Sequence, residues 1–372
     1  MFFVLKAKHI IAFGVLFIFL SVMAVFLFDE PEFSYTTVIE SLDEDGVQFL
    51  IDQIFNVRNE AILKGDSETV RKLYDTDKTN GLYAYDHEEK KIKYLANWSE
   101  KQGVTFTYIN SNVTVKWSKE KGSGYTVNLL VSTTYKYIYK DRPAAENVMR
   151  IGTYHQIDLA NYDGTWLITK EWYTDPFADS LNLDKLKTDD ITALILSNEA
   201  RDFSSIGESR IAAIKYADQY VGAADSGENE FNYNSDYKNY NSLGGDCANF
   251  ASQILYEAGN FKKNGTWNYA KDGSSAWLNA QAFKNYLLYS GRGSLIVSGT
   301  YSEVLELSYK LLPGDIVAYV KKGKVTHVSI ITGADSRGYA LVNCHNTDRF
   351  RVPWDLGWSD SGIKFYLIRV NY

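Results

Sequence analysis

The chain has few cysteines and histidines: its 372 residues include 2 Cys and 5 His. The two cysteines lie 97 residues apart, so the short-spaced ligand pairs of structural zinc sites are missing. After residue 9 there is no long basic run, and the formal net charge is −7. Nucleic-acid-binding proteins concentrate positive charge, so we expect no nucleic-acid partner. We also expect no metal and no cofactor.

Aromatic residues, in contrast, are plentiful. They make up 15% of the chain, with 28 Tyr and 8 Trp. This composition excludes an intrinsically disordered protein, because disordered chains have few aromatics. A length of 372 residues predicts two or three domains, each large enough for a hydrophobic core. Internal repeats and low-complexity segments are absent.

The N-terminal segment predicts a membrane anchor. Residues 10–28 contain no charged side chain, follow Lys6 and Lys8, and precede Asp29. Such a stretch is long enough to span a bilayer, and the charge asymmetry leaves the N-terminus inside. Bulky residues at its end favour an uncleaved anchor over a signal peptide. We therefore expect a single-pass protein of the cell membrane whose bulk is extracytoplasmic.

A cysteine stands where a helix is expected to begin. Gly244 and Gly245 break the backbone, Asp246 occupies an N-cap position, and Cys247 opens an apolar helical pattern. The helix dipole and free N–H groups at such a position lower a thiol pKa and can hold an oxyanion. The residues leave two interpretations open: a nucleophile, or a buried cysteine that acts as a small hydrophobe.

A histidine on a later strand supplies a candidate base. Residues 325–332 read as the second strand of a hairpin, and His327 lies within it, 80 residues after Cys247. A histidine on an apolar strand is more often a core residue than a catalyst. A cysteine on a helix followed by a histidine on a strand is nevertheless the arrangement that thiol activation requires.

At this point the sequence resembles a family, the bacterial "putative amidase domain", which is similar to the papain-like NlpC/P60 and CHAP cell-wall hydrolases. Four segments in the family's order carry the resemblance, within residues 205–372: 246–253, 312–317, 327–333 and 345–349. The resemblance implies a papain-like α+β domain, with Cys247 as nucleophile and His327 as base. It further implies an amide substrate, with peptidoglycan or another peptide as the expected partner.

The third catalytic position has two candidates on the strand 340–345. Side chains alternate along a strand, so Asn343 and His345 share one face while Cys344 points to the other. Either side chain can bond the second imidazole nitrogen of a catalytic histidine and so fix its orientation. We favour His345, because it begins the family-like segment, and Asn343 remains open.

Three other interpretations use the same residues. A zinc site of Cys247, Cys344, His327 and His345 is disfavoured by the long spacings. A disulfide between the two cysteines would remove the nucleophile. The last alternative is a non-catalytic surface protein, in which an inactive amidase fold serves binding or as a scaffold.

A separate unit precedes the amidase-like region. Two helical patterns, 47–73 and 83–98, are followed by four strand-like segments up to residue 172. This order resembles an NTF2-like α+β cone. We therefore predict an anchor at 10–28, an NTF2-like domain at 34–178, a linker with a bridging helix at 179–207, and the amidase domain at 208–372. The two folded domains are expected to separate at this junction.

Overall fold

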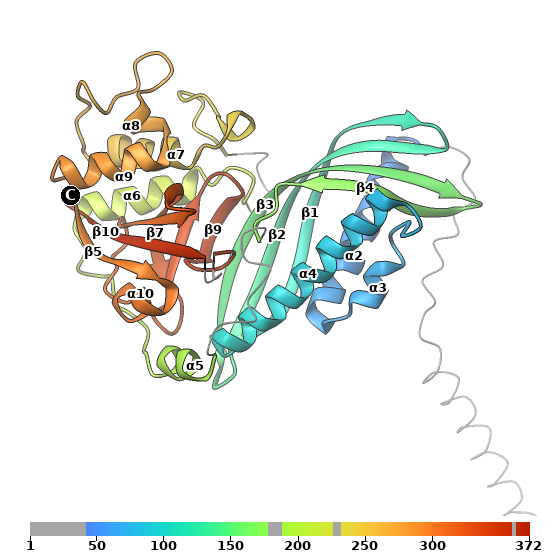
Figure 1. Ribbon diagram of the computed structural model, residues 1–372, viewed down its shortest axis with the longest axis horizontal. Coiled ribbons are helices and arrows are strands. Elements are labelled where there is room, and N and C mark those ends of the chain that lie inside the picture. Colours follow the sequence, from blue (N-terminus) through green and yellow to red (C-terminus); the bar gives the residue numbers. More distant parts are fainter. Residues whose placement is uncertain (1–41, 178–187, 226–231, 359–361) are drawn as a thin grey trace, which may run out of the picture. The chain divides into compact units, whose positions relative to one another are not determined.

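The computed structural model describes residues 42–177, 188–225, 232–358 and 362–372 (Figure 1). The predicted anchor at 10–28 and the first part of the predicted linker lie outside these ranges. Within the described ranges, no helix is long and apolar enough to cross a membrane. Contacts divide the chain into two compact units, residues 41–161 with 167–372 and residues 1–40 with 162–166. In the smaller unit, the structure describes only the turn at 162–166.

Three helices open the described chain: α2 (Glu44–Lys64), α3 (Ser67–Arg71) and α4 (Thr79–Gln102). The side chain of Asp43 caps α2 by accepting from Gly46 N at 2.9 Å. Gly65, with φ of 69°, ends the same helix in the left-handed conformation that a residue with a Cβ avoids. The helical patterns predicted at 47–73 and 83–98 are thus confirmed, with a break between α2 and α3.

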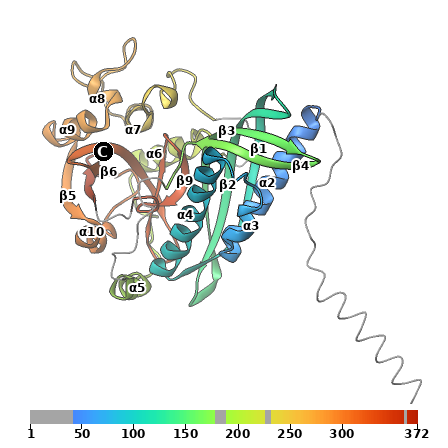
Figure 2. The same cartoon turned by 45° about the vertical axis from the view of Figure 1, so that its right-hand side comes forward.

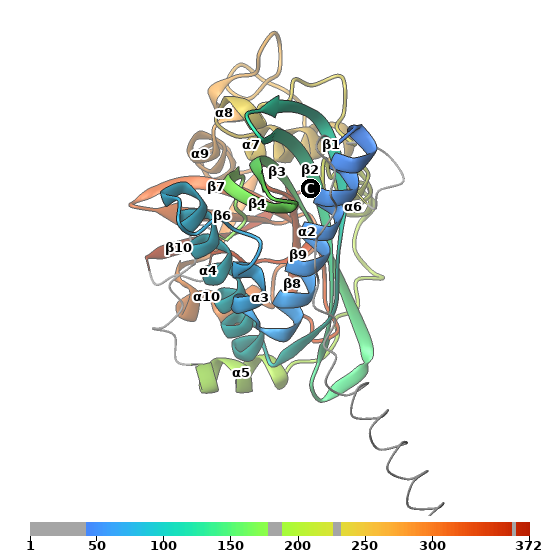
Figure 3. The same cartoon turned by 90° about the vertical axis from the view of Figure 1, so that its right-hand side faces the viewer.

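An antiparallel meander follows, made of β1 (Val104–Lys121), β2 (Gly124–Tyr139), β3 (Arg142–Tyr162) and β4 (Thr165–Tyr173). Helices α2 and α4 lie over the same face of strands β1–β3 (Figures 2 and 3). Buried and partly buried residues alternate along β2, as expected for a strand with one face on a core. Helices followed by a meander are the α+β order that the sequence predicts for this region.

The C-terminal part combines short helices with six further strands of the same sheet. Its helical elements are α5 (Thr188–Leu196), α6 (Glu208–Gln219), η1 (Asn241–Leu243), α7 (Cys247–Gln253), the π-helical turn η2 (Ile254–Ala258), α8 (Ser275–Leu278), α9 (Ala280–Tyr289) and α10 (Tyr301–Ser308). Its strands are β5 (Gly293–Thr300), β6 (Ile316–Lys321), β7 (Lys324–Ala334), β8 (Ala340–Cys344), β9 (Asp348–Pro353) and β10 (Ile363–Val370). Helix α5 corresponds to the predicted bridging helix.

All described strands belong to one sheet, in the order β1-β2-β3-β9-β8-β7-β6-β10-β5, with β4 beside β3. Strands β3 and β9 join the two halves through the antiparallel pairs Arg150↔Phe350 and Gly152↔Asp348. A Cβ on Gly152 would lie 2.4 Å from the backbone of Ala223, so position 152 of β3 has no room for a side chain. The sequence predicts two domains that separate near residues 176–207, whereas the strands on both sides of that junction share one sheet. The boundaries 34–178 and 208–372 stay predictions.

Two hydrophobic core clusters lie on this framework. The first combines Trp98 and Tyr137 of the N-terminal half with Tyr319 and Trp354 of the C-terminal half. The second gathers α6, α7 and α9 around Val328 and its neighbours in β6, β7 and β10. A mixed α+β fold is therefore confirmed, while the likeness to papain stays a prediction.

Candidate active site

Helix α7 begins at Cys247, as the sequence predicts. The backbone enters it through Gly244 and Gly245, whose φ angles are 114° and 122°. A Cβ on Gly245 would lie 2.9 Å from the side chain of Asn346, so conformation and space both require glycine there. Asp246 occupies the N-cap position without making a capping hydrogen bond.

The carboxylate of Asp246 instead ties the preceding loop to the helix. Its Oδ1 accepts from Tyr240 N at 3.0 Å and from Asn249 Nδ2 at 2.8 Å. Asp246 is 1% exposed, so these hydrogen bonds are shielded from water. The cysteine is thus held at the end of a fixed loop.

The Cys247 thiol is buried and protonated in this structure. Burial raises its pKa to about 12, against the lowering effect of hydrogen bonds from the backbone of Val328 and Ala248. The expectation that the helix start lowers the thiol pKa is therefore wrong for this conformation, because desolvation outweighs the backbone hydrogen bonds at the sulfur. Both cysteines are free, so the disulfide alternative is not realised here.

His327 lies on β7 but is not hydrogen-bonded to Cys247. Its ring stacks on Trp358 at 5.3 Å between centroids and packs against Tyr319 at 5.4 Å. The next residue, Val328, belongs to the core cluster that contains Cys247. Adjacent strand residues point to opposite faces, so the His327 ring faces away from that cluster. The described residues therefore do not form the predicted dyad.

The electrostatics of His327 favour a neutral ring. Burial, followed by the charge of Arg349, lowers its pKa to about 3. Its Nε2 is buried and has no hydrogen-bond partner among the described residues. A buried nitrogen without a partner is costly, because it has lost its hydrogen bonds to water. His327 thus meets one requirement of a general base, because its Nε2 makes no hydrogen bond to the described residues and can accept a proton.

His345 is paired with Asp246 rather than with His327. Its Nδ1 lies 2.7 Å from Asp246 Oδ2, and its Nε2 lies 2.7 Å from the carbonyl oxygen of Tyr220. Both partners are acceptors, so both ring nitrogens donate and the ring is an imidazolium. Burial alone would lower the His345 pKa, but the hydrogen bond to Asp246 and the charges of Asp348 and Asp246 raise it.

Asn343 is occupied in holding β8 to its neighbours. Its Oδ1 accepts from Thr332 Oγ1 at 2.9 Å and from Arg351 N at 2.8 Å. Its Nδ2 donates to Ala217 O at 3.1 Å and to Asp218 Oδ1 at 2.9 Å. Neither predicted third residue, Asn343 or His345, therefore orients His327 in this structure.

The predicted alternation along β8 is present nonetheless. Asn343 reaches Ala217 in α6, and His345 reaches Tyr220 at the end of the same helix. The Cys344 thiol instead donates to the carbonyl oxygen of Thr347, at 3.9 Å. A zinc site of both cysteines and both histidines is not formed, and the described residues contain no group of three or more His, Cys, Asp or Glu placed to hold a metal ion.

Sequence reasoning missed a buried acid beside His345. Asp348 is 0% exposed, and burial raises its pKa. Its Oδ2 accepts from Ala223 N at 2.8 Å and from the hydroxyl of Tyr233. A Cβ on Gly222 would lie 2.4 Å from that oxygen, so the close approach depends on glycine. The only sequence signal is that Asp348 falls within the family-like segment 345–349.

Tyr154 brings the N-terminal half to the same site. Its hydroxyl lies 2.9 Å from the hydroxyl of Tyr233, which in turn packs against the His345 ring at 5.0 Å between centroids. Tyr154 belongs to β3, the strand that pairs with β9. Nothing in the local pattern of residues 148–159 could have indicated this contact, because it depends on the long-range pairing.

Solved structures similar to this chain match it over about a third of its length. The intermembrane space region of the chloroplast protein ARC6 is 9% identical, covering 36% of this chain and 97% of that one, with a TM-score of 0.26. An NTF-2 like protein of unknown function from Shewanella oneidensis MR-1 is 15% identical, covering 34% of this chain and 98% of that one, with a TM-score of 0.19.

Two sequence matches were also found, one to a curated protein and one to a family. The uncharacterized protein YjcM of Bacillus subtilis (strain 168) is 34% identical over 176 residues. The match covers 44% of this chain and 37% of YjcM, so the chain spans little more than a third of that relative's length. Residues 207–368 match the family described as "Putative amidase domain". The C-terminal part of the chain is thus similar in sequence to an amidase domain.

Proposed function

We propose that the region 207–368 hydrolyses an amide bond with Cys247 as its nucleophile. One observation carries the proposal: the part of the chain that matches the amidase family contains a cysteine at a helix start, with backbone hydrogen bonds from Val328 and Ala248 at its sulfur. Such hydrogen bonds favour the thiolate and can stabilise an oxyanion.

The reaction proceeds through a thioester. The thiol loses its proton to a base, and the sulfur attacks the amide carbonyl carbon, placing negative charge on the carbonyl oxygen. Backbone N–H groups stabilise that oxyanion, the C–N bond breaks, and the amine leaves with the proton. Water then cleaves the thioester, releasing the acid and restoring the thiol.

His327 is the proposed base. Its neutral ring and its unpartnered Nε2 suit this role. In the described structure no hydrogen bond joins His327 to Cys247, and the ring faces the other side of β7, against Trp358 and Tyr319. The role therefore requires a local rearrangement of β7 that brings the ring to the thiol. The residue that orients His327 after this rearrangement stays a prediction, with His345 and Asn343 as the candidates.

The substrate class and location are part of the same proposal. A charge-free stretch at 10–28 favours attachment to the cell membrane, with the catalytic part on the outer side. An amide-cleaving enzyme in that position meets the peptides of the cell wall. We therefore propose peptidoglycan, or another extracytoplasmic peptide, as the substrate.

A specific observation favours a second function, binding without catalysis. The thiol of Cys247 and the ring of His327 are both buried and make no hydrogen bond to each other, whereas a thiolate–imidazolium pair needs one. A domain that keeps this conformation would hold a peptide or glycan without cleaving it.

The deciding experiment is digestion of purified sacculi by the full chain in detergent, with mass analysis of the released fragments. Amide hydrolysis predicts new fragments that differ from uncut material by one water per cleaved bond. Cys247→Ala should abolish their release, and the matched control Cys344→Ala should leave it within about twofold. Sacculi that bind the protein but remain uncut would support the second function.

A further inference from the structure

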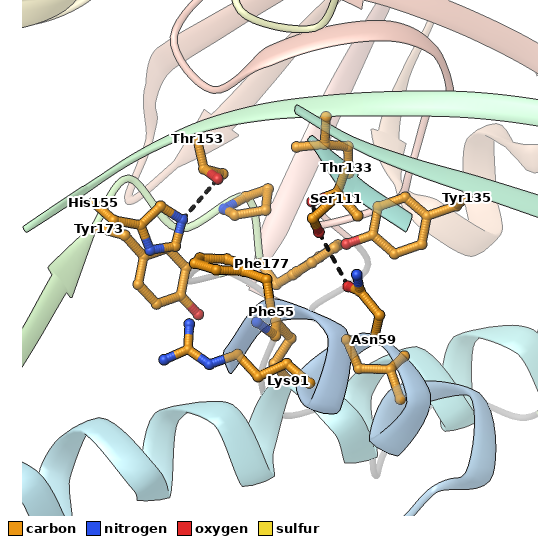
Figure 4. Close-up of a pocket in the computed structure, with 14 residues that line it drawn as sticks. Phe55, Asn59, Lys91, Ser111, Thr133, Tyr135, Thr153, His155, Tyr173 and Phe177 are labelled. Atoms are coloured by element: carbon orange, nitrogen blue, oxygen red, sulfur yellow. Dashed lines mark hydrogen bonds between the residues drawn. The ribbon is translucent and has the colours of Figure 1, made fainter. Parts of the chain in front are cut away.

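A cavity lies in the N-terminal half, between the helices and the meander (Figure 4). It leaves about 30 Å³ for the centres of added atoms. One water needs roughly 10–15 Å³ by the same kind of measure, so a group of several atoms fits. Lys91 and Tyr173, which also line the cavity, are only partly buried, so the cavity meets the surface there.

One wall of the cavity carries hydrogen-bond donors without partners. Asn59 is 5% exposed, and its Nδ2 has no partner among the described residues. Its Oδ1 is already used, accepting from Ser111 Oγ at 3.1 Å (Figure 4). Arg58 is 2% exposed, and its Nε is likewise unpartnered within the described ranges. A ligand with an acceptor atom would stabilise these donors, because each buried donor left unpaired lowers the free energy of unfolding.

On another wall, the hydroxyl oxygen of Thr153 is oriented so that it can accept a hydrogen bond. His155 Nε2 lies 2.8 Å from Thr153 Oγ1 (Figure 4). On the other side of the ring, His155 Nδ1 lies 2.8 Å from Glu171 Oε1. Burial lowers the His155 pKa, so the ring is neutral, with Nδ1–H donating to the carboxylate. The Thr153 hydroxyl must then donate its hydrogen to Nε2. Its lone pairs remain to accept from a ligand.

The charges around the cavity are compensated within the protein. Arg58 pairs with Glu171, and both side chains are 2% exposed. Lys91 pairs with Glu88 at 2.5 Å. An anionic ligand would therefore find each of these two cations already paired with a carboxylate. A neutral ligand avoids that desolvation cost.

We propose that this cavity binds a small neutral amide, such as a primary carboxamide or the end of an amide-bearing side chain. The amide oxygen accepts from Asn59 Nδ2 and Arg58 Nε, and the amide N–H donates to Thr153 Oγ1. An amide is neutral and presents an acceptor and a donor side by side, as these two walls require. This site is independent of Cys247 and of the proposed hydrolysis.

The test compares two probes of nearly equal size, acetamide and acetate, on the full chain in detergent. With ¹⁵N-histidine labelling, acetamide should shift the His155 resonance in a saturable way, whereas acetate at the same concentration should not. The Cys247→Ala variant should respond in the same way, which separates this proposal from the proposed activity. Equal or stronger binding of acetate would overturn the proposal in favour of an anion site.

Variants then test the two walls. Thr153→Val removes the acceptor at constant shape and should weaken acetamide binding about tenfold, the effect of one lost hydrogen bond. Asn59→Leu should weaken it at least as much. Thr105→Val, at an exposed position of β1, is the matched control and should leave binding unchanged. If acetamide shifts no His155 resonance in wild-type protein at saturating concentration, the cavity holds water and the proposal is wrong.

Discussion

Breaking the buried ion pair between Lys101 and Asp355 should destabilise both halves of the chain together. Lys101 lies on α4 and is 1% exposed, and Asp355 follows β9 and is 0% exposed. The Asp355 carboxylate also accepts from Tyr339 Oη at 2.8 Å and from Trp98 Nε1 at 3.3 Å. One carboxylate thus serves three donors drawn from both halves.

The expected cost follows from what Asp355→Asn leaves behind. Burial lowers the Lys101 pKa, and the charge of Asp355 opposes that shift. Without the carboxylate, the ammonium is buried and unpaired, which costs about 3–5 kcal/mol. Replacing both members by apolar residues, Lys101→Met with Asp355→Leu, should recover most of this loss, because no charge then remains buried.

The assay is urea denaturation of the full chain, followed by circular dichroism and tryptophan fluorescence. The control is Glu60→Ala, which breaks an exposed pair with Lys64 and should cost less than about 1 kcal/mol. A loss below about 1 kcal/mol for Asp355→Asn would refute the reasoning. Two separate transitions, of which the variant moves only one, would show that the halves unfold independently.

Three further outcomes follow from the site. Burial raises the pKa of Cys247 to about 12 and of Cys344 to about 11. Iodoacetamide should therefore label either thiol slowly at pH 7 and faster as pH rises, because the thiolate is the reactive form. Rapid labelling of Cys247 at pH 7 would contradict this. The His327 pKa falls from 6.5 to about 3 on folding, so the unfolded state binds more protons between those pH values and the free energy of unfolding drops as pH falls. In urea denaturation between pH 6.5 and 4.5, His327→Gln should therefore reduce the dependence of this free energy on pH by up to about 1.4 kcal/mol per pH unit. If the wild-type and variant free energies change with pH in parallel, His327 is not the cause. His345→Ala should lower the melting temperature and the turnover together, because Asp246 loses its buried partner, whereas a residue that only orients the base would lower turnover alone.

Local patterns predicted much of the framework. The helices before residue 103, the meander and the start of α7 at Cys247 all follow from periodicity and glycine positions within a few residues of each element. The alternation of Asn343 and Cys344 along β8 was also predictable, since the side-chain period of a strand is fixed.

Other features of the fold and the site depend on long-range packing, which local sequence patterns do not indicate. The hydrogen bond between His345 and Asp246 joins residues 99 positions apart, and no local signal marks it. The raised pKa of Cys247 depends on how completely the surrounding core excludes water, while its place at a helix start predicts the opposite shift. The pairing of β3 with β9 likewise joins residues about 200 positions apart, such as Gly152 and Asp348.

The most direct test of the central claim is to trap the thioester on Cys247. The full chain is mixed with an amide substrate that it cleaves, quenched in acid within the first turnover, digested and analysed by mass spectrometry. The account predicts the acyl group of the substrate on the peptide that contains Cys247, absent from the Cys247→Ala protein and present in Cys344→Ala. Cleavage that continues in Cys247→Ala, or an acyl group found only on another residue, would contradict it.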